Sequence, residues 1–153
     1  MDVRSADAKE GLMYCLDANV WIYYLDKRTD EHESVVDTVS DIVEDEPIFT
    51  TTVLQMEVVH YLHTQLTDPD ELLDRFLFLD ETLVAELRRE DIEAATELLG
   101  DYPNTGIGGR DATVLAAMRR YDVSHLWTHD NGLKRVGADL EWLEVTDPVA
   151  ERG

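Results

Sequence analysis

The sequence predicts a single α/β domain in which helices cover both faces of a parallel sheet. Apolar runs of strand length at 13–16, 48–51 and 125–128 contain no Asp, Glu, Lys or Arg, which is typical of strands buried on both faces. Stretches with helical spacing separate these runs, and alternating strands and helices indicate a parallel sheet. The 153 residues are enough for one core, and the single cysteine, Cys15, excludes an internal disulfide.

Each element follows from the spacing of apolar residues and from the residues that stop it. Asn19, Thr52 and Asp68 are the side chains expected to cap helices. The expected order is strand 13–16, helix 20–25, helix 33–44, strand 48–51, helix 53–65, helix 69–79, strand 82–87, helix 92–99, loop 101–109, helix 111–121, strand 125–128, helix 132–136 and strand 140–145.

The ends of the chain are polar. We expect residues 1–12 to be a poorly ordered extension, 13–146 to be the folded domain and 147–153 to be a tail. Met1 and Met13 both remain possible natural starts. No apolar run approaches the roughly 18–20 residues of a membrane helix, and the N-terminus lacks the apolar centre of a secretory signal, so we expect a cytoplasmic protein without a membrane partner.

The chain is very acidic, with 34 Asp and Glu against 13 Lys and Arg and a formal net charge of -21. The acids are spread along the chain, which favours adaptation to a salty cytoplasm over an acidic tail. At about 1 M salt the Debye length falls to about 3 Å, so most of the charge repulsion is screened. The net charge therefore does not exclude a nucleic-acid substrate.

Four acids occupy positions that suggest chemistry. Asp17 and Asp130 each follow a buried strand, at the edge where open α/β sheets place their ligands. Glu57 lies on the apolar face of a predicted helix, where an unpaired carboxylate is unfavourable. Asp111 opens a helix after a glycine-rich loop. Structural alternatives remain open: a helix cap for Asp111, a turn for Asp17 and Asp130, and a buried ion pair for Glu57.

Four convergent carboxylates would raise one another's pKa values unless a cation joined them. Ligand sets made only of oxygen favour Mg²⁺ or Mn²⁺ over zinc or copper. A divalent ion held by carboxylates can activate water and stabilise charge on a phosphate. The acids therefore predict hydrolysis of a phosphodiester without a covalent enzyme intermediate.

This ordered set of motifs resembles a PIN domain and, within that family, the VapC-type toxins of toxin–antitoxin pairs. The residues that carry the resemblance are Leu16-Asp17-Ala18-Asn19, Glu57, Arg110-Asp111-Ala112 and Thr128-His129-Asp130. The match covers nearly all of 13–146. It departs from many relatives at Leu133, where they have an aromatic residue, and we expect this position to be packing.

The resemblance implies a sheet in the order 3-2-1-4-5 and a metal-dependent endoribonuclease. By position it makes Asp17, Glu57, Asp111 and Asp130 the catalytic and metal-binding acids, with Asn19 and Thr128 as polar companions. It also implies an RNA substrate, a homodimer and a small antitoxin partner. We expect the antitoxin to dock on apolar residues of the first two helices, namely Trp21, Tyr24, Leu25, Val35, Val39 and Ile42.

Other residues keep two interpretations. Arg110, Lys134 and Arg135 can contact RNA phosphates or pair with surrounding acids. His60 and His63 lie one helical turn apart, which allows a metal site, but no third ligand is evident. Trp21, Tyr23 and Tyr24 can stack on bases or pack the helix.

Two other functions within the family also remain open: an RNA-processing PIN nuclease without an antitoxin, and a silent PIN scaffold that binds protein or RNA. A haloacid-dehalogenase-like phosphatase is disfavoured. Such an enzyme needs a second aspartate two residues after Asp17, and this chain has Asn19 there.

Overall fold

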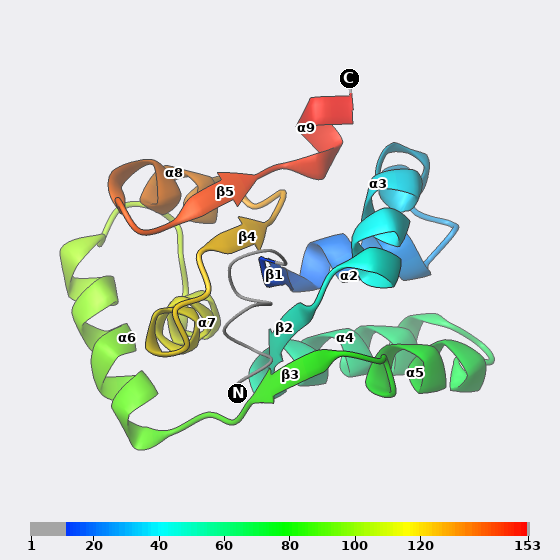
Figure 1. The fold of residues 1–153 in the computed structure, drawn as a ribbon, viewed down its shortest axis with the longest axis horizontal. Helices are drawn as coiled ribbons and strands as arrows, with labels where there is room; N and C mark the ends of the chain where they lie inside the picture. The colour runs from blue at the N-terminus through cyan, green and yellow to red at the C-terminus, as the bar shows by residue number, and fades with distance from the viewer. Residues whose placement is uncertain (1–11, 153) are drawn as a thin grey trace, which may run out of the picture.

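The computed structural model describes residues 12–152, and the predictions about residues 1–11 lie outside that range. Five strands form one parallel sheet in the order β3-β2-β1-β4-β5 (Figure 1). The strands are β1 (Tyr14–Leu16), β2 (Ile48–Thr51), β3 (Thr82–Ala85), β4 (His125–Trp127) and β5 (Glu144–Thr146). The predicted fold class and strand order are therefore confirmed.

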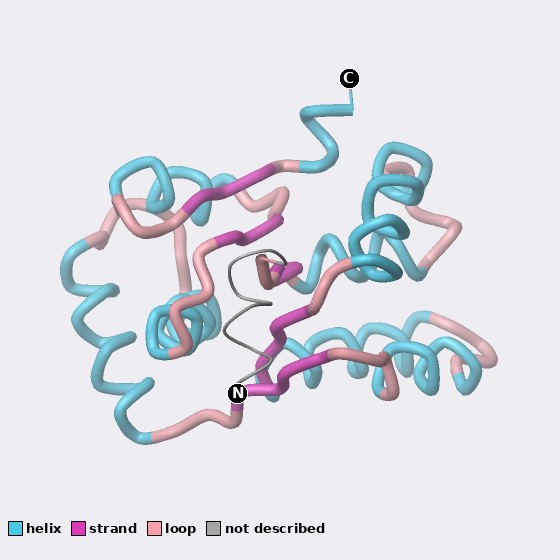
Figure 2. The backbone as a smooth tube through the Cα atoms, viewed as in Figure 1, coloured by secondary structure: helices cyan, strands magenta, loops and turns pink. Residues whose placement is uncertain are grey.

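Helices connect the strands and cover both faces of the sheet (Figure 2). In Figure 1, α6, α7 and α8 lie on one side of the sheet, and α2 and α3 lie on the other. The helices are α2 (Ala18–Leu25), α3 (His32–Asp45), α4 (Thr52–Gln65), α5 (Asp70–Leu77), α6 (Arg89–Asp101), α7 (Gly109–Arg120), α8 (Asn131–Asp139) and α9 (Pro148–Arg152). None of the helices described is long and apolar enough to cross a membrane.

All three predicted helix caps were wrong. Asp17, not Asn19, caps α2, because the helix starts directly after β1 with no loop between them. Thr51, the last residue of β2, caps α4 by accepting the Leu54 N–H through its Oγ1 at 3.0 Å. Pro69 occupies the cap position of α5, so Asp68 does not cap that helix.

The boundaries of the last elements also differ from the prediction. The final strand is Glu144–Thr146 rather than 140–145, because α8 continues to Asp139 and a turn follows it. Helix α9 lies in the segment 147–153, for which no helix was predicted. Asp147 stabilises its first turn by accepting the N–H groups of Val149 at 3.0 Å and Ala150 at 3.3 Å.

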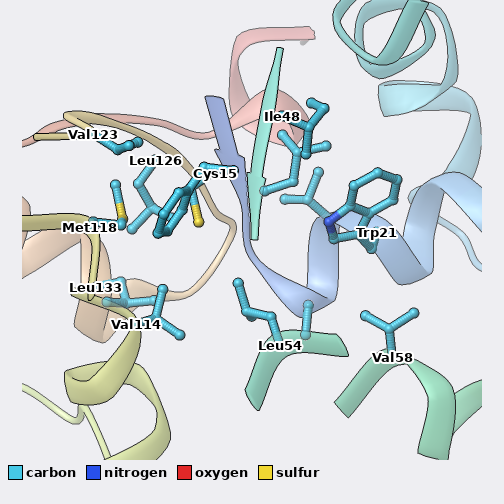
Figure 3. Packing of buried hydrophobic residues seen from close by; sticks show 14 of the residues in the cluster. Cys15, Trp21, Ile48, Leu54, Val58, Val114, Met118, Val123, Leu126 and Leu133 are labelled. Atoms are coloured by element: carbon cyan, nitrogen blue, oxygen red, sulfur yellow. The ribbon is translucent and has the colours of Figure 1, made fainter. Parts of the chain in front are cut away.

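The core forms on both faces of the sheet (Figure 3). Cys15, Met118 and Leu126 pack together on one side, while Ile48 and Trp21 pack on the other. Leu133 is buried, as expected for a packing position.

The apolar residues predicted for antitoxin docking do not form a surface, and only Tyr24 among them is partly exposed. Trp21, Leu25, Val35, Val39 and Ile42 are all buried, because α2 and α3 pack against each other and against the sheet. Trp21 packs edge-to-face on Phe76, with ring centroids 5.0 Å apart, and is not available to stack on a base. This part of the antitoxin prediction was wrong.

Candidate active site

The carboxyl ends of β1 and β4 lie side by side, and this arrangement brings Asp17 next to Thr128. The strands pair in register, with Leu16 opposite Trp127. The Asp17 N–H donates to the Trp127 carbonyl at 2.9 Å, and the Thr128 hydroxyl donates to Asp17 Oδ2 at 2.6 Å. The same hydroxyl accepts the Asp130 N–H at 3.0 Å. Thr128 therefore links two of the four predicted acids through one buried hydroxyl group.

Asp17 and Asp130 are also helix caps. Asp17 Oδ1 accepts the Ala18 N–H at 2.8 Å at the start of α2, and Asp130 Oδ2 accepts the Leu133 N–H at 2.8 Å at the start of α8. The partial positive charge of a helix N-terminus stabilises a carboxylate placed there. Both acids thus cap a helix and also lie at the edge of the sheet. Capping alone does not explain why the Thr128 hydroxyl links them.

The loop before α7 brings Asp111 close enough to Asp130 for their charges to interact. Gly106 has φ +93°, and the loop packs so closely on α8 that a Cβ at Gly132 would lie 2.9 Å from backbone atoms of Thr105 and Gly106. Arg135 Nη1 donates to the Thr105 carbonyl at 2.6 Å. This clamp fixes the start of α7, where Asp111 lies in the first turn.

Glu57 lies on α4 and lines a groove of about 730 Å³ between α2 and α4. Its side chain is about one quarter exposed, and its Oε2 lies 3.5 Å from Nε of the exposed Arg110. The ion pair considered as an alternative for Glu57 is therefore present, but it involves an exposed arginine from the turn that also carries Asp111.

Burial and mutual repulsion raise the pKa values of three of the acids. Burial raises the pKa of Asp17, and the nearby charges of Glu57 and Asp130 add to this, while the Thr128 and Ala18 hydrogen bonds lower it. Burial and then the charges of Asp17 and Asp130 raise the pKa of Asp111 to about 6. Burial and the charge of Asp111 raise the pKa of Glu57, against the effect of Arg110.

These carboxylates fit a divalent cation by their chemistry. They offer only oxygen ligands and repel one another, and a cation would remove that repulsion. Within the described residues, no three His, Cys, Asp or Glu side chains close on one point as a preformed metal cluster. Mg²⁺ suits such an open set, because it keeps several waters and uses few direct carboxylate ligands.

The PIN domain family model matches residues 14–139 of the chain. The protein belongs to the PIN domain family. PIN nucleases generally use a divalent metal ion. A comparison with curated proteins finds no match.

Solved structures with the same fold include toxins of toxin–antitoxin systems. A Mycobacterium tuberculosis toxin, VapC20, which cleaves the sarcin–ricin loop, is 16% identical with a TM-score of 0.68, covering 81% of this chain and 95% of that chain. VapBC2 from Rickettsia felis, bound to promoter DNA, is 15% identical with a TM-score of 0.63, covering 88% and 98%. FitAcB from Neisseria gonorrhoeae is 21% identical with a TM-score of 0.63, covering 89% and 98%. At these identities the likeness concerns the fold.

The predicted polar and basic residues of this PIN domain have definite partners. Asn19 Oδ1 accepts the His129 N–H at 3.4 Å, which joins the start of α2 to the end of β4. Lys134 Nζ donates to Asp147 at 2.6 Å, and Arg135 holds the loop through Thr105. Both cations therefore make internal contacts. The predicted pair of His60 and His63 is exposed on α4 and belongs to no metal-binding group among the described residues.

A cluster around Asp147 was not predicted from the sequence. This buried carboxylate binds His129 Nδ1 at 2.9 Å and Lys134 Nζ at 2.6 Å, and these contacts lower its pKa against the effect of burial. His129 and Lys134 lie on either side of Asp130 in the chain. Asp147 therefore anchors the segment that carries Asp130. The only sequence signal was an acid immediately before Pro148, at the end of the last predicted strand.

Proposed function

We propose that this PIN domain is a metal-dependent endoribonuclease and the toxin of a toxin–antitoxin pair. One observation carries the proposal: burial, and then the charges of neighbouring site acids, raise the pKa values of Asp17, Glu57 and Asp111, and the nearby Arg110 only partly offsets this for Glu57 and Asp111. In a domain that only had to fold, replacing these acids by neutral residues would increase stability. A catalytically silent PIN scaffold would therefore not need them.

Asp17, Asp111 and Asp130, with Glu57, would hold Mg²⁺ or Mn²⁺. When bound, such an ion supplies an activated water and stabilises charge on the phosphate. Thr128 orients Asp17 and Asp130 through its hydroxyl. Arg110 is exposed beside Glu57 and is able to meet a phosphate oxygen through its guanidinium group.

The test is cleavage of a mixed RNA pool with Mg²⁺ or Mn²⁺ by the wild type and by Asp17→Asn and Asp111→Asn. Both variants should lose cleavage and keep a folded circular dichroism spectrum. Asp37→Asn is the matched control, because Asp37 is exposed on α3 away from the site, and it should cleave like the wild type. Undiminished cleavage by both site variants, or full activity in excess chelator, would exclude the proposed chemistry.

The toxin assignment rests on the structural neighbours, several of which were solved as toxin–antitoxin complexes. An antitoxin arginine aimed at the acids would be attracted by their charge and would compete with the metal ion. Copurification from the native host followed by mass spectrometry tests this partner. Recovery of free, active nuclease without a small bound protein would favour the RNA-processing alternative, and the mass of the native particle would test the expected homodimer.

A further inference from the structure

The acids of this chain avoid four stretches of sequence that form the elements around the candidate active site. The stretches are 12–25, 47–67, 102–121 and 123–138. Each contains a single acid, and these acids are, in order, Asp17, Glu57, Asp111 and Asp130. Every other Asp and Glu of the chain lies outside these stretches. The negative charge of the surface is thus interrupted around the site.

Burial alone does not explain this distribution. The exposed residues of α4 are Met56, His60, His63, Thr64 and Gln65, and none is acidic. The exposed positions of α3 and α6, in contrast, carry acids such as Asp37 and Glu97. The loop that precedes α7 is also largely exposed and lacks acids from Tyr102 to Arg110. Solvent-facing positions near the site have therefore been kept free of negative charge.

The groove of about 730 Å³ between α2 and α4 is lined by a face of α4 on which Glu57 is the one acid. Its apolar lining includes Ala18, Ile22 and Val53, and His60 and Gln65 add polar groups. Glu57 and Arg110 also line it. A ligand in the groove would thus meet Glu57, one of the four acids of the candidate site.

We propose that this groove holds the nucleotide that flanks the scissile phosphate of a single-stranded RNA, with His60 and Gln65 contacting the base. The proposal rests on the proposed nuclease function and names where its substrate lies. Unpaired bases pack on apolar surfaces and form hydrogen bonds through their edges. An apolar protein helix would need few acids only in the groove itself, whereas a polyanion also needs few acids on the surface around it. The extent of the acid-poor region therefore favours RNA.

The test compares two histidines on the same helix. His60 lines the groove, and His63, one turn further along α4, is exposed but does not line it. Each is changed to Glu in the full chain carrying Asp17→Asn, which prevents cleavage. The probe is a fluorescent, mixed-sequence single-stranded RNA on the order of ten nucleotides long, a length within the range one binding site covers. Measurements at about 1 M KCl limit charge effects to about 3 Å and so to direct contact.

We expect His60→Glu to raise the Kd for the RNA roughly tenfold, as for loss of one base contact, and His63→Glu to change it less than about twofold. In the cleavage-competent chain, His60→Ala should raise KM and shift the preferred cleavage sites, while His63→Ala should do neither. Thermal midpoints show whether each variant is folded.

Equal effects of the two Glu variants, or no effect of His60→Glu, would overturn the proposal and leave the groove to another occupant such as an antitoxin helix. This failure is distinct from failure of the nuclease assignment, because RNA cleavage by a His60 variant with wild-type KM would uphold the nuclease and reject the groove. Failure of the wild type to cleave any RNA, with selective loss of binding in His60→Glu, would reject the nuclease and uphold the groove.

Discussion

Replacing Asp111 by Asn should stabilise the metal-free protein while removing its activity. Burial, followed by repulsion from Asp17 and Asp130, raises the pKa of Asp111 from 3.8 to about 6. Each pKa unit corresponds to about 1.36 kcal/mol, so a fully buried group with this shift would destabilise the fold by about 3 kcal/mol. Asp111 is only partly buried, and solvent screening reduces the expected gain from Asn to about 1–2 kcal/mol.

The direction of the pH dependence follows from the raised pKa. Above the folded-state pKa the carboxylate is charged in both states, and the folded state carries the full penalty. As the pH falls through about 6 toward the unfolded value of 3.8, the folded protein takes up its proton first and the penalty disappears. The advantage of Asn over Asp should therefore be largest at neutral pH and should shrink between about pH 6 and pH 4.

Urea unfolding in the presence of chelator measures this difference at several pH values. Adding Mn²⁺ should reverse its sign, because the wild type then gains metal-binding free energy that the Asn variant loses. Asp37→Asn, on the exposed face of α3, should stay within about 0.5 kcal/mol of the wild type throughout. An Asp111→Asn variant that is no more stable than the wild type in chelator at neutral pH would refute the electrostatic reasoning, as would an advantage that grows on acidification.

Three further changes test the site and the surface. Gly132→Ala should reduce stability by about 1–3 kcal/mol and weaken Mn²⁺ binding, because its Cβ would lie 2.9 Å from the backbone of the loop before Asp111. Gly100→Ala is the control, because a Cβ there meets no atom within 4 Å. Equal effects of the two variants on Mn²⁺ binding would contradict the role of Gly132 in fixing this loop. Thr128→Val should reduce the free energy of unfolding by about 1–3 kcal/mol, because it loses the hydrogen bonds to Asp17 and Asp130. Thr128→Ser keeps the hydroxyl and should lie nearer the wild type. Similar losses in both variants would show that these hydrogen bonds do not contribute the stability. Because the net charge is -21, the thermal midpoint should rise between about 0.1 M and about 2 M KCl, and a flat or falling midpoint in calorimetry would contradict the adaptation to salt.

The central strands were predictable because a buried parallel strand leaves a clear pattern in the sequence, and the order of the strands followed from the resemblance to the PIN family. Met13 to Leu16 and Ile48 to Thr51 have no charged residue, and both contain strands of the central sheet. Helix starts were less predictable, because the choice between two adjacent polar residues depends on where the preceding strand ends. Asp17 and Thr51 cap the following helix directly where their strands end, with no intervening loop.

The candidate site was accessible to sequence reasoning wherever a polar residue followed a strand, as Asp17, Thr128 and Asp130 do. Asp147 was missed because its role depends on contacts with His129 and Lys134, which no local pattern reveals. The prediction of an antitoxin surface was wrong for a related reason. Apolar spacing in α2 and α3 shows that each helix has a face to bury, but it does not show that the two helices bury these faces against each other and the sheet.

The proposed adaptation to high ionic strength would also account for the lack of a cluster of free cations at the site among the described residues. At about 1 M salt, attraction between a surface cation and a phosphate extends only about 3 Å, so distant basic residues add little to RNA affinity. Lys134 and Arg135 make internal contacts, which hold Asp147 and the loop before α7. Under such conditions the proposed RNA binding would depend on direct contacts and on a scarcity of acids along the path of the RNA strand. Arg110 beside Glu57, and helix α4 with Glu57 as its one acid, would meet both requirements without a basic patch.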